Sequence, residues 1–332
     1  MSLGGRRRAL VAFAGTALTF GTAFAGIKAG LAAVPPALFA GVRFVGGGLL
    51  LLGVWGALGR LDRPRGRGDW WGVLAAGAFL VWLNGVTLFV GQRTVTSAAA
   101  ATLFAALPVL TPLFARVVLG ERLGARRTAG LAVGFAGTLV VVAPDPGALA
   151  SVSPGRALVG VAVVSAALGG VLLRRAAPAM DSVSLTGWAM LLGGCGALAT
   201  SRALGESWTV TWTPGAAVAV GYVVAVATAV SFPTYFWLIG TVGPTRANLT
   251  SYVVPLVAAV AGAVAFGETV APTTAAGFLV IAVGFLVMEW ETVREAFGRG
   301  DPSADEGAGS GAPPPGGGGA PADGVDDVGR ER

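Results

Sequence analysis

The sequence predicts an all-α integral membrane protein of ten transmembrane helices, arranged as two inverted five-helix repeats and followed by a disordered C-terminal tail. Three observations predict this fold class: the composition, the length of the apolar stretches, and an internal repeat. The chain is 54% hydrophobic and only 12% charged. Its mean hydropathy of +0.74 excludes an ordinary soluble domain of this length.

The apolar stretches give the expected helices, since about 20 helical residues cross roughly 30 Å of hydrocarbon. We expect helices at 9–30, 35–58, 70–91, 96–119, 128–143, 157–177, 182–201, 214–240, 246–266 and 271–291. They define a cytoplasmic N-terminus (1–8), a first five-helix repeat (9–143) and a second (157–291). Residues 298–332 are rich in Gly, Pro, Ala and Asp and are predicted to be disordered, because they bury too little apolar surface to offset chain entropy.

The internal repeat places residues 96–142 over residues 243–289 without a gap. Each copy covers two apolar stretches, which is typical of a duplicated helical membrane bundle. Apolar identities are common in so hydrophobic a chain, so the Pro, Gly and Glu matches carry the argument. These matches are Pro108 with Pro255, Gly120-Glu121 with Gly267-Glu268, and Gly137 with Gly284.

The loop charges predict the orientation. Arginines gather at 6–8, 60–67, 122–127 and 174–175, on alternate connections, and the loops between them hold few. Arginine-rich loops are cytoplasmic, so both termini are predicted to be cytoplasmic. Five helices per half is an odd number, which inverts the second copy. One alternative is a signal peptide cleaved before Gly26, which would leave four helices in the first half.

Several chemistries are excluded by composition. The chain has no histidine and a single cysteine, Cys195, so His-ligated metals, Ser-His or Cys-His catalysis and a disulfide framework are not possible within it. We expect no catalytic residues, metal or cofactor. The arginines are scattered over short loops, which argues against nucleic acid as a partner. Their excess over the one lysine hints at a GC-rich genome and a prokaryotic plasma membrane.

Lys28 and Arg43 are the charged side chains closest to the hydrocarbon. Arg43 lies about eight residues into its helix, or roughly 12 Å below the outer boundary. A charge at that depth normally faces the bundle interior, because exposure to lipid costs several kcal/mol. Both residues are therefore candidate substrate ligands for a carboxylate or phosphate. The alternative is structural: Arg43 bonds helix-end carbonyls and Lys28 reaches the membrane surface.

Polar and aromatic residues at membrane depth are further candidates for a substrate site. Each could instead form a helix-to-helix hydrogen bond or a packing contact. Pro108 and Pro255 each remove one helical hydrogen bond, and we expect kinks that serve as hinges, although prolines are also common in membrane helices without such a role. The further substrate-site candidates are Trp82, Asn84, Tyr235, Trp237, Asn248 and Ser251, with Ser231 beside them.

Glu121 and Glu268 each follow a glycine, and we expect each to cap the start of the next helix. The glycines of the 128–143 and 271–291 stretches form small faces that permit close helix packing. These faces could pack within one chain or form a homodimer.

Together these residues resemble the EamA family of the drug/metabolite transporter superfamily, over residues 9–290. The resemblance implies two inverted five-helix halves and secondary transport of small metabolites, often export of amino acids. Phe20 stands where the family commonly has Trp. The matching features are Phe20-Gly21, Phe24, Lys28, Pro36-x6-Arg43 and two Pro-x11-Gly-Glu-x8-Gly-x6-Gly repeats.

The expected function is secondary transport, with export, of a small organic metabolite by alternating access between the two halves. The cargo is expected to carry an anionic group, as an amino acid does. The chain has no Gly-rich phosphate loop, and its coupling ion stays open, with Glu289 one candidate. The alternatives are an integral membrane enzyme and a non-transporting scaffold. The expected partners are the small-molecule substrate and the lipid bilayer.

Overall fold

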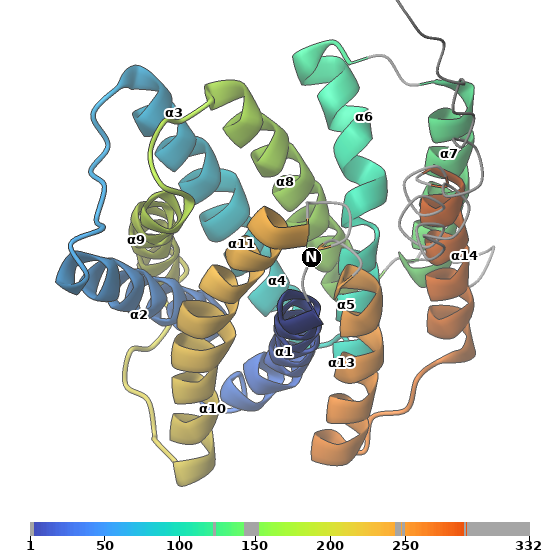
Figure 1. Cartoon of the computed structure of the whole chain (residues 1–332). Helices are drawn as coiled ribbons and strands as arrows, with labels where there is room; N and C mark the ends of the chain where they lie inside the picture. The colour runs from blue at the N-terminus through green and yellow to red at the C-terminus, as the bar shows by residue number, and fades with distance from the viewer. Residues whose placement is uncertain are drawn as a thin grey trace, which may run out of the picture.

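The computed structural model describes residues 3–121, 124–142, 153–242, 247, 250–288 and 290, and these residues form helices and their connections (Figure 1). Seven spans among them are long and apolar enough to cross a membrane, and α13 and α14 are shorter apolar helices. This confirms an all-helical integral membrane protein. The helices are α1 (Leu3–Gly30), α2 (Pro36–Ala57), α3 (Arg67–Ala75), η1 (Ala76–Leu83), α4 (Asn84–Gln92), α5 (Ser97–Ala105), α6 (Leu107–Leu119), α7 (Ala125–Val142), α8 (Pro154–Ala176), α9 (Ser182–Ala203), α10 (Pro214–Val224), η3 (Ala225–Val230), α11 (Ser231–Val242), α13 (Thr250–Phe266) and α14 (Pro272–Met288).

Three of the expected helices are not uniform. The 96–119 stretch divides at Ala106 into α5 and α6, and Pro108 is the second residue of α6, where its missing N–H costs no helical bond. The 70–91 and 214–240 stretches contain the π-helical segments η1 and η3, which widen the helix locally. The 298–332 tail lies outside the described residues.

Glycines bring two pairs of helices into close contact. α7 and α14 lie side by side at one edge of the bundle, and α2 and α9 cross at the other (Figure 1). A Cβ added at Gly284 would come 2.7 Å from the Gly130 carbonyl oxygen, and one at Gly48 would come 2.9 Å from the Gly187 carbonyl oxygen. Only glycine permits this approach of the backbones. These glycine faces therefore pack against one another within the chain, and the homodimer stays a prediction.

α1 occupies the middle of the bundle (Figure 1) and packs against α13, α10 and α11. α8 packs in a similar way against α6 and α4. The space between these two groups of helices is where the functional site lies.

Candidate functional site

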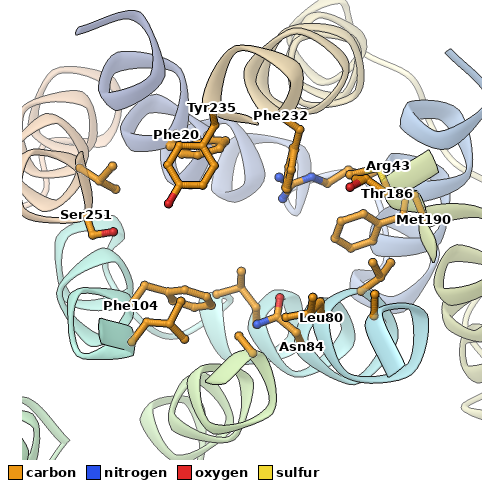
Figure 2. Close-up of a pocket in the computed structure, with 18 of the residues that line it drawn as sticks. Phe20, Arg43, Leu80, Asn84, Phe104, Thr186, Met190, Phe232, Tyr235 and Ser251 are labelled. Atoms are coloured by element: carbon orange, nitrogen blue, oxygen red, sulfur yellow. The ribbon is translucent and has the colours of Figure 1, made fainter. Parts of the chain in front are cut away.

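A cavity of about 420 Å³, the central cavity, lies between α1, α2, η1, α4, α5, α6, α8, α9, α11 and α13 (Figure 2). Its volume falls within the range of small-molecule sites. The wall is mostly apolar. Within the described part of the chain, Arg43 is the single charged side chain that lines it, and no carboxylate does.

Arg43 is held by its neighbours but leaves part of its guanidinium available. Its Nε donates a 3.1 Å hydrogen bond to Thr228 Oγ1, and its Cζ lies 5.1 and 5.8 Å from the ring centroids of Phe44 and Phe89. These contacts offset part of the cost of burying the charge. The terminal nitrogens have no hydrogen-bond partner among the described residues, and they point toward the open middle of the cavity (Figure 2). They can therefore bind a carboxylate or phosphate.

The π-helical segment η3 positions Thr228 for this role. Thr228 Oγ1 donates to the Val223 carbonyl, five residues earlier, at 2.8 Å, and accepts from Arg43 Nε. Ser231 donates to the Val226 carbonyl over the same spacing. These bonds follow the five-residue repeat of the π-helix, so the wider turn and the Arg43 contact are part of one arrangement.

Asn84 supplies a polar group on the opposite wall. Its Nδ2 donates to the Ala162 carbonyl at 2.8 Å, which fixes the amide so that Oδ1 faces the cavity (Figure 2). Ser251 also lines the cavity (Figure 2). An acceptor and a hydroxyl placed away from the cation can orient the remainder of a bound anion.

Aromatic rings form much of the remaining wall. The Phe20 ring lies 5.5 Å from Phe232 and 5.8 Å from Tyr235, both edge-to-face, and Phe24 meets Phe104 at 5.9 Å. Such a wall excludes water and contacts an apolar or planar solute body. Phe20 therefore provides an aromatic contact at the position where the resembling family commonly has Trp.

The structure brings together four of the candidate substrate ligands, namely Arg43, Asn84, Tyr235 and Ser251. Lys28, Trp82 and Trp237 do not line the central cavity. Trp82 Nε1 donates to Thr200 Oγ1 at 2.8 Å, and Trp82 and Trp237 are 43% and 46% exposed on the outside of the bundle. Ser231 is buried away from the cavity. Asn248 lies outside the described residues.

The two candidate hinge prolines differ in their surroundings. Pro108 follows the break at Ala106, whereas Pro255 lies inside the continuous helix α13. The residues four positions before them, Phe104 near the end of α5 and Ser251 in α13, both line the central cavity. The hinge role stays a prediction.

Sequence reasoning missed several wall residues, including Phe44, Leu80, Thr186, Met190 and Phe232. Apolar side chains at mid-membrane depth are as common on lipid-facing surfaces as in cavities, so their residue type carries no signal. Two wall residues had a signal in the sequence, namely a nearby proline that can expose backbone at membrane depth. Phe232 is adjacent to Pro233, and Phe104 lies four residues before Pro108.

Two ion pairs, Lys28–Glu268 and Arg174–Glu121, lie outside the cavity. Glu268, after α13, pairs with Lys28 of α1 and accepts a 2.9 Å hydrogen bond from the Ser97 N–H at the start of α5. Glu121, after α6, pairs with Arg174 of α8. The expectation that Glu268 caps the next helix was wrong, because the helix that it caps, α5, belongs to the other half of the chain.

The fold and cavity define a multi-pass α-helical membrane protein with an internal chamber for a small solute. Its sequence matches the model of the EamA-like transporter family over residues 7–143 and 153–290, and the chain belongs to that family. It is therefore a membrane transporter and not an enzyme.

Curated relatives include two bacterial proteins and one plant protein. The uncharacterized transporter YvbV of Bacillus subtilis is 29% identical over 79% of this chain and 85% of its own length. The uncharacterized inner membrane transporter YedA of Escherichia coli K12 is 28% identical over 80% and 86%. A chloroplastic WAT1-related protein of Arabidopsis thaliana is 25% identical over 82% and 67%.

A solved structure described only as the crystal structure of a protein is also similar. Its TM-score is 0.60 at 24% identity, and the match covers 87% of this chain and 99% of that chain. This similarity concerns the fold alone.

Proposed function

We propose that this protein is a secondary transporter that exports a small organic metabolite with an anionic group, such as an amino acid, by alternating access. The observation that carries the proposal is the unpaired end of the Arg43 guanidinium in a cavity without a lining carboxylate among the described residues. A cationic site with apolar walls favours an anion and disfavours a cation.

The helix contacts support the proposed architecture of two inverted five-helix repeats. The two matches to the family model, over residues 7–143 and 153–290, pair the helices of the halves in order: α1 with α8, the α5–α6 pair with α13, and the α3–α4 helix with the α10–α11 helix. The contact of α1 with α13 corresponds to that of α8 with α6, and the contact of α1 with α10 and α11 corresponds to that of α8 with α3 and α4. Two halves with interchangeable contacts are the geometry that alternating access uses.

The proposed location is a plasma membrane with both termini in the cytoplasm. The arginine-rich loops support this orientation. The printed name of the Escherichia coli relative places that protein in the inner membrane.

The substrate is identified by a metabolite screen that compares cells with and without the protein, followed by transport measurements in proteoliposomes. For the cargo found, R43Q should reduce transport by about 10- to 150-fold, since a charge-assisted contact contributes about 1.5–3 kcal/mol. R43K keeps the charge but cannot form the bidentate hydrogen bonds of a guanidinium with a carboxylate, so it should retain intermediate activity.

The matched control is R202Q, which removes an arginine that stacks on Trp208 at 3.8 Å, outside the cavity. R202Q should leave transport within about twofold of the unmodified protein. Normal transport by R43Q, or a cargo without an anionic group, would contradict the proposal.

A further inference from the structure

The two ion pairs occupy equivalent positions in the two halves. The displacement that aligns Gly41 with Gly187 carries Lys28 onto Arg174. The displacement that aligns Pro108 with Pro255 carries Glu121 onto Glu268. Each pair therefore joins the cation at the end of one half's first helix to the acid after the other half's fourth helix.

Each pair lies directly beyond one end of the central cavity. Ile27, next to Lys28, lines the cavity, and so does its equivalent Leu173, next to Arg174. An ion pair at either end therefore joins two of the helices that border the cavity. α1 and α13 are joined at one end, and α8 and α6 at the other.

The two ends are packed differently. The side chains of Lys28 and Glu268 are 26% and 8% exposed, whereas those of Arg174 and Glu121 are 53% and 46% exposed. Ile27 is buried and Leu173 is half-buried. Two fully buried rings, Phe39 and Phe89, meet edge-to-face at 5.1 Å near the Lys28 end. The chain is therefore closed at the Lys28 end and looser at the Arg174 end.

The two halves also differ by one side chain next to the acids: residue 115 is alanine, whereas its equivalent, residue 262, is glycine. The backbone N–H of Glu121 bonds to the Ala115 carbonyl, and that of Glu268 bonds in the same way to the Gly262 carbonyl. The Glu268 carboxylate occupies the space that a Cβ on residue 262 would need. Ala115, the equivalent of Gly262, carries that Cβ and is buried, so Glu121 cannot fold back in the same way.

We propose that Lys28–Glu268 and Glu121–Arg174 are two opposed latches that set which end of the central cavity is closed. The inference rests on the proposed alternating-access function. When the cavity opens at the Lys28 end, the Lys28–Glu268 pair becomes exposed and the Glu121–Arg174 pair becomes buried. The acids and cations of both pairs are positioning residues, because they lie outside the substrate cavity.

The test measures accessibility and needs no cargo. Leu88 lines the cavity on α4, near the Lys28 end, and is replaced by cysteine in a C195S background. A membrane-impermeant maleimide is added to intact cells, and the labelling rate of L88C reports how often the Lys28 end opens.

In this background E268Q should raise the external labelling rate by about tenfold or more, because it breaks the buried latch. E121Q should lower the rate, because it weakens the latch that closes the opposite end. K28Q should raise the rate in the same direction as E268Q, because either substitution breaks the pair, and K28Q leaves the Glu268 bond to the Ser97 N–H in place. If E268Q and E121Q merely loosened the fold, both would shift the labelling rate of L88C in the same direction.

Glu206 provides the matched control, since its carboxylate accepts hydrogen bonds from the Ala37 and Leu38 N–H groups at the start of α2. E206Q removes the same charge at the same end of the molecule without affecting a latch, and should leave the labelling rate within about twofold. G262A tests the latch without removing a charge. It should raise the labelling rate, because the added methyl group displaces the Glu268 carboxylate, and A115G should lower it.

Equal or same-direction changes in E268Q and E121Q, or an unchanged rate in K28Q, would overturn the latch assignment. Transport of the identified cargo by those variants would then leave the proposed function standing. Opposite shifts in labelling without any transported anion would support the latches and count against the proposed cargo.

Discussion

Arg43 makes the site asymmetric at the level of single residues. Its equivalent in the second half is Ala189, which also lines the central cavity. The scaffold is thus duplicated, but its binding charge is not. A bound anion should lie toward the α2 side of the cavity, with the rest of the molecule directed toward the aromatic rings and Asn84.

The polarity of the Asn84 wall can be tested with a single added charge. N84D places a carboxylate in a cavity whose described lining has none, so it should pair with Arg43 or repel an anionic cargo. We expect at least about 100-fold loss of transport in proteoliposomes. N84L, which adds no charge, should lose less than about tenfold. Equal effects of the two variants would contradict an anion site.

At the residue scale, depth along an apolar helix was the informative signal in the sequence. Arg43 was identifiable because a charge so far into an apolar helix needs an interior environment. The partner Thr228 was not identifiable, because its position depends on a π-helical turn that apolar periodicity does not report. The contact of Lys28 with Glu268, 240 residues away, was also not identifiable, because it depends on the packing of α1 against α13.

At the level of the helices, the apolar stretches predicted where most helices lie, while their internal breaks were harder to predict. Hydropathy averages over a whole turn, so it does not distinguish an α-helix from the π-helical segments η1 and η3. Hydropathy can also fail to identify a whole helix, as it does for α7. Arg126 and Arg127 occupy its first turn, and it is not among the seven spans that length and composition identify. Its place in the bundle comes from the glycine contacts with α14.

The α7–α14 contact should be sensitive to one methyl group. In G284A the new Cβ would meet the Gly130 carbonyl oxygen and Gly134 Cα at 2.7 Å, which ordinary contacts do not allow. We expect destabilisation of about 1–3 kcal/mol, seen as a lower thermal unfolding midpoint in detergent.

Gly160 on α8 is the control for this change, because a Cβ there would have nothing within 4 Å. G160A should leave the midpoint unchanged or raise it slightly, since alanine favours helix more than glycine does. An equal loss of stability in both variants would show that helical glycine itself, and not the contact with α14, determines the midpoint.

For the whole molecule, the sequence was sufficient to predict a helical membrane bundle and the transporter family. The helical bundle follows from hydropathy, which accumulates along the chain, whereas the family followed from the resemblance of motifs such as Pro36-x6-Arg43 and the two Pro-x11-Gly-Glu-x8-Gly-x6-Gly repeats. The shape of the cavity was not predictable in the same way. It depends on which faces of α1, α4, α9 and α11 meet, and the hydrophobic side chains on those faces are chemically indistinguishable from those that face lipid.

The absence of a lining carboxylate among the described residues has an energetic consequence for export. A carrier that moves a monoanion outward transfers one negative charge per cycle. A potential of about 100 mV, negative inside, contributes about 2.3 kcal/mol to that step. This corresponds to a gradient of roughly 50-fold without any coupled ion. In proteoliposomes with a potassium diffusion potential, an interior-negative voltage should accelerate anion efflux and an interior-positive voltage should slow it. For a monoanionic cargo, efflux that is indifferent to voltage would mean that a compensating ion accompanies it, whereas a zwitterionic amino acid has no net charge and its efflux should not depend on voltage.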